Sequence, residues 1–284
     1  MPRISFSSQI PVPRHYLWEV YSRPGMFERL TPPWQRLQTV WQRGGIAPGD
    51  ERMLRVKLGP VWTPWHVVHH DWEPGWFFSD EQVRGPFRHW FHRHRFDDAA
   101  DGGVILTDDI EFELPPYPVA SLLGEAVVRQ QLRRMFRHRH RRSFHDVVLH
   151  HRYVERPRRS VLLRAPEGPL KRGLTWFLRA GGHSVSEDET RPDVVILVDP
   201  RGTASPTVPT LEGTPALAIV VSPAGMNAPW PGPRADRIVW GRVGTIITGE
   251  VGLLRQVAEL SVEAGCRGKV SWSALDDLIG ALYT

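Results

Sequence analysis

Cysteine and lysine are both scarce in this sequence. The 284-residue chain holds one cysteine, Cys266, which excludes an internal disulfide framework and a metal site built from several thiolates. The lysines are Lys57, Lys171 and Lys269, so nearly all of the positive charge comes from arginine. We attribute this preference for arginine over lysine to codon bias, and the net charge of +5 is only a mild excess. A nucleic-acid partner is therefore not expected.

Long apolar runs are also lacking. No stretch approaches the roughly 18 uninterrupted apolar residues that a membrane-spanning helix needs. The N-terminal residues Met1 to Phe6 do not form the apolar segment of a signal peptide. We therefore expect a cytoplasmic protein with no membrane partner.

Histidine and tryptophan are plentiful, but they are unevenly distributed. Twelve of the 13 histidines precede residue 152, and His183 is the exception. Eight of the 12 tryptophans precede residue 91. The two parts of the chain are thus chemically different, and this predicts two domains, 1–152 and 160–284, joined by a linker at 153–159.

The first domain has the pattern of an antiparallel meander followed by a long helix. Two short helices are expected around residues 15–30, and residues 119–149 are predicted to form one long helix. Links such as Gly59-Pro60 and Gly85-Pro86 are too short for crossover helices. The predicted strands are 3–11, 36–42, 51–58, 62–71, 75–83, 86–96 and 103–114.

The strand at 85–96 reads Gly-Pro-Phe-Arg-His-Trp-Phe-His-Arg-His-Arg-Phe and is unusual on both faces. Because successive side chains alternate, one face carries Trp90, His92, His94 and Phe96. Both faces mix aromatic with ionisable groups, whereas an ordinary half-buried strand has one apolar and one polar face. Such a strand suits the wall of a ligand cavity.

The order of elements and three motifs resemble the START-like, or SRPBCC, superfamily that includes polyketide cyclases. A bacterial subgroup of it has G-P-F-x-x-W-x-H-x-H-x-F in its sixth strand, and residues 85–96 match this pattern. Residues 107–115 resemble its next strand, and Phe136-Arg-His-Arg-His140 resembles its helix. The resemblance implies an α+β helix-grip fold, in which a curved antiparallel sheet surrounds a long C-terminal helix and a ligand cavity lies between them.

We expect that cavity to hold a small apolar or aromatic molecule. Its aromatic residues could stack on a flat ligand or could fill the core. Asp108 could form an acid/base pair with His92 or His94, or it could be a solvated strand end. The candidate ligand-binding residues are Trp65, His66, Trp90, His92, His94, Phe96, Asp108, Phe112, Leu132 and Phe136.

Two other features of this domain allow more than one interpretation. His92 and His94 could bind a metal ion with His66 or His70, but no matching carboxylate pair is obvious, and we expect hydrogen-bonded histidines and no metal. Arginines recur every four residues on the long helix, at 129, 133, 137 and 141. This stripe is either a solvated face or a contact for an acidic partner or a phosphate backbone.

The second domain resembles the extended short-chain dehydrogenases, in particular a bacterial epimerase-like family with a Rossmann fold. Residues 161–185 align without a gap with the first strand and turn of that family, V-L-V-T-G-A-x-G-F-I-G, with the helix that follows, and with the family's next motif, G-H-x-V. The fingerprint glycines of the family then fall on Ala165, Gly168 and Lys171, and Pro169 removes one backbone N–H from the helix start. Strands are expected at 192–198, 216–221 and 237–247, and helices at 253–260 and near 276.

Catalysis by this second domain is not expected. The chain has no tyrosine between Tyr153 and Tyr283, so the Tyr-x-x-x-Lys pair of the family is missing. With its altered glycine fingerprint, the domain resembles a shortened α/β Rossmann-like pseudoenzyme, for which no NAD(P) cofactor is expected. Fusion of a helix-grip domain to such an epimerase is a known arrangement in this family.

These observations favour a non-catalytic ligand-binding protein whose second half is a scaffold or a homodimerisation unit. One alternative is a cyclase or dehydratase that uses His92, His94 and Asp108. The other alternative is an NAD(P)-dependent epimerase or reductase.

Overall fold

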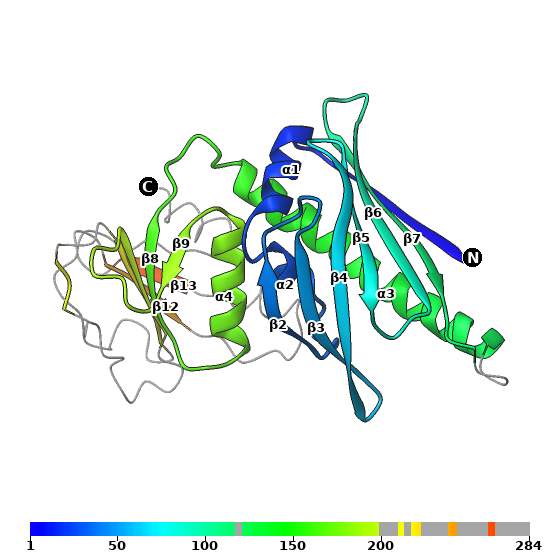
Figure 1. Cartoon of the computed structure of the whole chain (residues 1–284). Coiled ribbons are helices and arrows are strands. Elements are labelled where there is room, and N and C mark those ends of the chain that lie inside the picture. Colours follow the sequence, from blue (N-terminus) through cyan, green and yellow to red (C-terminus); the bar gives the residue numbers. More distant parts are fainter. Residues whose placement is uncertain (117–120, 199–209, 213–216, 223–237, 243–260, 265–284) are drawn as a thin grey trace. The chain divides into compact units, whose positions relative to one another are not determined.

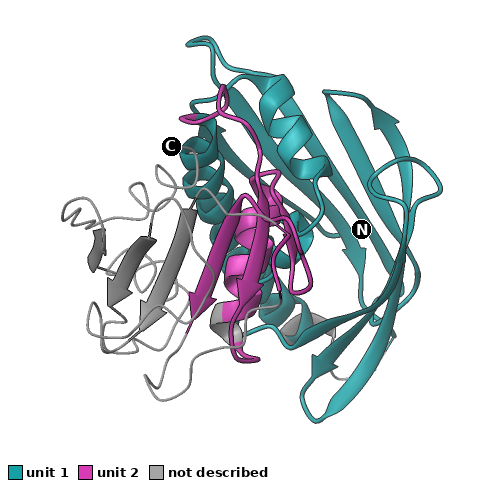
Figure 2. Cartoon of the chain, turned by 90° about the vertical axis from the view of Figure 1, so that its left-hand side faces the viewer, with its two compact units in different colours: residues 1–151 teal, residues 152–284 magenta. Residues whose placement is uncertain are grey.

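The structure, a computed structural model, describes residues 1–116, 121–198, 210–212, 217–222, 238–242 and 261–264 (Figure 1). The chain forms two compact units, Met1–His151 and Arg152–Thr284 (Figure 2). We call them unit 1 and unit 2 and describe each by itself. Among the described residues, no helix is both long enough and apolar enough to cross a membrane.

In the residues that the structure describes, unit 1 is a seven-stranded antiparallel sheet with three helices. The strand order is β1-β7-β6-β5-β4-β3-β2, so the first strand pairs with the last and the others follow the chain. The elements are β1 (Arg3–Ile10), α1 (Arg14–Ser22), α2 (Met26–Leu30), β2 (Leu37–Arg43), β3 (Glu51–Leu58), β4 (Val61–Glu73), β5 (Phe77–Arg84), β6 (His89–Asp98), β7 (Val104–Glu113) and α3 (Ser121–His151). The predicted antiparallel sheet with helices is confirmed, and the α+β class with it.

The core of unit 1 lies between the sheet and α3. Leu132 and Phe136 of α3 pack into one buried cluster with Trp90 of β6 and with Ile110 and Phe112 of β7. These three strand residues alternate with more exposed neighbours, as expected for a sheet with one face against a core. The face that meets α3 is therefore the one that carries Trp90, His92 and His94.

The long helix α3 buries part of its length and exposes the rest. Arg133, Arg137 and Arg141 are exposed, so most of the arginine stripe is a solvated face. Phe144, although apolar, is also exposed (38%), whereas Asp146 is buried against Arg29 of α2. The pair is bidentate: Nε of Arg29 lies 2.5 Å from Oδ2 of Asp146, and Nη2 of Arg29 lies 3.2 Å from Oδ1 of Asp146. This ion pair joins α2 to α3.

Unit 2 contains a six-stranded sheet and, in its described part, one helix. The strand order is β13-β12-β11-β10-β8-β9, and all pairs are parallel except β12 with β13. The elements are β8 (Ser160–Arg164), α4 (Pro169–Ala180), β9 (Ser184–Ser186), β10 (Val194–Val198), β11 (Leu217–Ser222), β12 (Ile238–Arg242) and β13 (Ser261–Ala264). The helices predicted at 253–260 and near 276 lie outside the described residues.

Candidate functional site

Three neighbouring strands bring four ionisable side chains to one face of the sheet. Asp80 of β5 lies opposite His92 of β6, and His94 of β6 lies opposite Asp108 of β7. Paired residues on antiparallel strands project to the same face, and so do residues two apart on one strand. All four side chains therefore lie on the face that carries Trp90, against which α3 packs.

Asp108 is the centre of this arrangement. It is 1% exposed, and its Oδ1 lies 3.0 Å from Nε2 of His92. Its Oδ2 lies 2.8 Å from Nε2 of His140, which comes from α3. Nδ1 of His94 is 2.5 Å from Oδ1, although it lacks the alignment of a hydrogen bond. The interpretation of Asp108 as a solvated strand end is therefore wrong.

His140 is a member of the site that the sequence analysis missed. Its Nδ1 lies 2.7 Å from the hydroxyl of Ser8 on β1, while its Nε2 faces Asp108. His140 follows Phe136 by four residues and so lies on the same face of α3. The motif Phe136-Arg-His-Arg-His140 contained this signal, because Phe136 was already a candidate ligand-binding residue.

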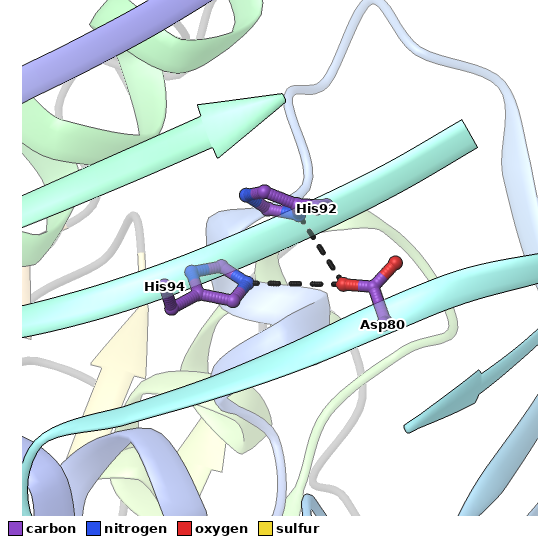
Figure 3. Close-up of side chains that lie close together, drawn as sticks. All are labelled: Asp80, His92 and His94. Atoms are coloured by element: carbon purple, nitrogen blue, oxygen red, sulfur yellow. Dashed lines mark ion pairs between the residues drawn. The ribbon is translucent and has the colours of Figure 1, made fainter. Parts of the chain in front are cut away.

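Asp80 is the second residue that the sequence analysis missed. Its Oδ2 lies 3.2 Å from Nδ1 of His92 and 4.0 Å from Nε2 of His94 (Figure 3). Its Oδ1 accepts a hydrogen bond of 3.4 Å from the indole N–H of Trp90. Each of the two imidazoles thus has one nitrogen toward Asp80 and the other toward Asp108. We refer to Asp80, His92, His94, Asp108 and His140 as the Asp–His cluster.

The groups of the cluster set one another's charge. Burial would raise the pKa of Asp80, but the facing His92 lowers it to about 2. Burial would raise the pKa of Asp108, but it is held well below its usual range by His94, which is protonated at the low pH where Asp108 titrates, and by the hydrogen bonds from His140 and His92. Both carboxyl groups are therefore ionised at neutral pH.

The two strand histidines differ in charge. Burial would lower the pKa of His92, but Asp80 and Asp108 raise it to about 9. Burial lowers the pKa of His94, and the neighbouring charge of His92 lowers it further, to about 4. At neutral pH His92 is therefore a cation between two carboxylates, and His94 is a neutral imidazole.

The apolar candidates gather beside the cluster. Trp65 of β4 meets Trp90 edge to face, with ring centroids 5.2 Å apart, and lies 5.9 Å from the ring of Phe87. Gly85 leaves room for this packing, because a Cβ there would come within 2.6 Å of Cδ1 of Trp65. The other apolar candidates of this region belong to the buried core cluster, namely Trp90, Phe112, Leu132 and Phe136.

Phe96 lies in a different aromatic group. Its ring is fully buried and contacts Trp18 and Tyr21 of α1, at 5.6 and 5.3 Å between centroids. It also stacks on Phe78 of β5 at 6.0 Å. Phe96 therefore helps to fix α1 on the sheet, at the end of β6 away from Trp90.

The structure does not bring His66 or His70 to the cluster. His66 follows Trp65 directly, so its side chain projects from the opposite face, where Nε2 lies 2.7 Å from Oε2 of Glu51. His70 lies an even number of residues after His66 on the same strand, so it is expected on the same face, and its side chain is exposed beside Asp71. The third group near His92 and His94 is the carboxylate of Asp80 instead of an imidazole.

In unit 2, the positions of the fingerprint glycines lie around the start of α4. Gly168 precedes the helix in an extended conformation, and Ala165 is half-buried in the loop after β8. The ammonium group of Lys171 forms ion pairs with Glu167 and with Glu187, the latter at 2.6 Å. Its charge is therefore already neutralised by two carboxylates of its own unit.

Comparison with known proteins shows a likeness in fold. No protein-family model matches the sequence, and no curated protein does so either. A nucleoside-diphosphate sugar epimerase from Corynebacterium glutamicum is similar in structure, with a TM-score of 0.57 and 21% identity over 77% of this chain. This chain spans 54% of the length of that structure. At this identity the likeness concerns the fold alone.

Smaller structures match about half of the chain. The Zhui aromatase/cyclase from a Streptomyces species has a TM-score of 0.39 and 14% identity, over 51% of this chain and 93% of its own. A protein from Thermus thermophilus has a TM-score of 0.40 and 15% identity, over 50% of this chain and 97% of its own. The site residues therefore have to be interpreted from their own geometry.

Proposed function

We propose that unit 1 binds a small, mostly apolar aromatic molecule that carries a hydrogen-bond acceptor. One observation carries this proposal: the indole N–H of Trp65 is buried and has no hydrogen-bond partner among the described residues. A buried donor without a partner costs about 1–3 kcal/mol, so such a group in a native protein requires an explanation. An acceptor on a bound molecule would satisfy this N–H.

The surroundings of Trp65 define the rest of the molecule that it would bind. Its neighbours are the rings of Phe87 and Trp90, which favour an aromatic or aliphatic body. On the far side of Trp90 lies the Asp–His cluster, beginning with the hydrogen bond from Trp90 to Asp80. The ligand would thus meet aromatic side chains on one side and a fixed polar group on the other.

For unit 2 we propose a supporting role without cofactor chemistry. Its parallel strands, among which β8 lies between β10 and β9 and is followed in the chain by α4, are compatible with the Rossmann-like interpretation. Lys171, the cation that stands where the family has its third glycine, is paired with Glu167 and Glu187. The chain also has no tyrosine between Tyr153 and Tyr283 for the family's acid/base step. A scaffold or a homodimerisation unit is consistent with these features.

We expect 2-acetylnaphthalene to bind more tightly than 2-ethylnaphthalene, since only the former has a carbonyl acceptor. Trp65→Phe keeps an aromatic ring but removes the donor. The variant should bind 2-acetylnaphthalene roughly tenfold more weakly, because one hydrogen bond contributes about 1–1.5 kcal/mol to the binding free energy. Equilibrium dialysis of the full chain with each compound measures both affinities. The affinity for 2-ethylnaphthalene should stay nearly unchanged in the variant.

Trp41→Phe is the matched control, because Trp41 lies on β2 beside His66, on the other face of the sheet from Trp65. It should leave both affinities unchanged. Equal affinity of the wild-type protein for the two compounds, or no binding of either compound, would contradict the proposal.

An acid/base reaction on such a ligand is the second candidate, because His94 lies between the carboxylates of Asp80 and Asp108. A group of this kind could remove a proton next to a carbonyl. Proton NMR in deuterium oxide would then show protein-dependent loss of the acetyl methyl signal of 2-acetylnaphthalene. An unchanged signal under conditions where the compound is bound would leave binding alone as the function.

A further inference from the structure

Three donor atoms in unit 1 lie at the separations of a metal centre. Oδ2 of Asp80 is 3.2 Å from Nδ1 of His92 and 4.0 Å from Nε2 of His94. One ligand atom from each residue lies within 4.8 Å of the other two. Metal–ligand bonds of about 2.0–2.2 Å at tetrahedral angles separate neighbouring ligand atoms by roughly 3.3 Å. Only a small movement of His94 toward Asp80 would therefore bring the three donor atoms to the separations at which they can bind one ion.

The second nitrogen of each imidazole is held as metal ligands usually are. Nε2 of His92 lies 3.0 Å and Nδ1 of His94 lies 2.5 Å from the same oxygen of Asp108. The hydrogen bond from His92 puts a proton on its Nε2 and directs Nδ1 toward Asp80, and the negative charge of Asp108 favours a proton on Nδ1 of His94, which leaves Nε2 toward Asp80. His140 holds Asp108 from α3, and Ser8 holds His140 from β1. The carboxylate behind the two imidazoles is thus itself anchored.

The charge of the site also suits a divalent cation. The side chains of Asp80 and Asp108 are 15% and 1% exposed, and they place two carboxylates on either side of His92 and His94. Buried charges need compensation close by. A dication bound by Asp80 and the two imidazoles would balance both carboxylates.

We propose that Asp80, His92 and His94 form a binding site for one divalent transition-metal ion (Figure 3). The donors are two imidazole nitrogens and a carboxylate oxygen, a set that suits Zn²⁺ and other first-row dications and that leaves a position for water or another ligand. The proposal does not depend on the binding of an aromatic molecule, because the donors are all supplied by the protein.

Titration of the full-length protein, stripped with EDTA and freed of any affinity tag, tests this site. We expect calorimetry with ZnCl₂ to show one ion per chain with a Kd of about 1 µM or tighter. Co²⁺ should give the visible absorption bands of a low-symmetry nitrogen–oxygen site, and Zn²⁺ should remove them. Asp80→Asn and His94→Gln should each weaken Zn²⁺ binding about 100-fold or more, since each replaces a strong ligand by a weakly binding amide, and loss of even an outer partner costs about 10–100-fold.

His66→Gln is the control, because His66 is also paired with a carboxylate, Glu51, but on the opposite face of the sheet. It should leave the affinity and the Co²⁺ spectrum unchanged. Absence of saturable binding and of Co²⁺ bands in the wild-type protein would overturn the proposal, whatever the folding of the variants. So would retention of wild-type affinity by Asp80→Asn and His94→Gln when circular dichroism shows both to be folded.

Discussion

Replacement of Asp108 by asparagine should lower the free energy of unfolding of unit 1 by about 3–5 kcal/mol, the range for breaking a buried charged pair. Asp108 accepts a hydrogen bond from His92 and one from His140, and Nδ1 of His94 is also close. Asparagine offers one acceptor oxygen and turns two N–H donors toward these imidazoles. It also removes one of the two negative charges that balance the His92 cation.

Urea denaturation of the full chain, followed by tryptophan fluorescence, measures this change, because eight of the 12 tryptophans precede residue 91. The adjacent Asp109 gives the control: it projects from the other face of β7, is 40% exposed and pairs with Arg95. Asp109→Asn should lower the free energy of unfolding by about 1 kcal/mol or less. Similar losses in the two variants would show that Asp108 is not the centre of the cluster.

Asp146→Asn should also destabilise unit 1 by about 3–5 kcal/mol at neutral pH, since it would leave the guanidinium of Arg29 buried without its charge partner. The two side chains are only 4% and 2% exposed, so solvent cannot replace the lost contact. Because this ion pair joins α2 to α3, the variant should loosen the docking of α2 before the sheet unfolds.

The contribution of Asp146 should depend on pH with a defined sign. Burial raises its pKa, but Arg29 first, and then Arg142 and His150, lower it below its usual value. A group whose pKa is lowered by folding stabilises the protein above its unfolded pKa of about 4, and this contribution disappears as the pH falls through the folded pKa. The difference in stability between wild type and Asp146→Asn should therefore shrink below about pH 4.

Urea denaturation of both proteins between pH 7 and pH 3 gives this difference directly. Glu19→Gln is the control, because Glu19 of α1 forms an i,i+4 pair with Arg23, directly after the helix, and is 60% exposed. It should change the stability by about 0.5 kcal/mol or less. A difference between wild type and Asp146→Asn that stays constant down to pH 3 would exclude ionisation of Asp146 as its cause.

The strands of unit 1 could be predicted because turn signals separate short alternating segments. The segment predicted at 51–58 is β3 as observed, and the predicted 86–96 overlaps β6 (His89–Asp98). Alternation also placed Trp90, His92, His94 and Phe96 on one buried face. Helical periodicity alone does not predict that the apolar Phe144 is exposed, because this depends on the rotation of α3 against the sheet.

The partners in the site were harder to predict than the strands. Asp80 meets His92 only because of the register between β5 and β6, and the neighbouring β4–β5 pair is interrupted by irregularities between His66 and Val67 and between His69 and Trp72. Such shifts change which residues lie opposite one another, and a single sequence does not reveal them. The error for His66 was avoidable, since Trp65 and His66 are adjacent on one strand and cannot share a face.

The pairing of β1 with β7 has a consequence for how the protein folds during synthesis. Ser7 on β1 contacts Thr107 on β7 across 100 residues of chain, the hydroxyl oxygens being 3.2 Å apart. At about 5–20 residues per second, the ribosome needs roughly 5–20 s to make that stretch. During this time β1 has no strand to pair with, and each later strand up to β7 is in turn an unpaired edge. Non-local pairing of this kind makes folding slow, so completion of the sheet depends on the last strand to emerge.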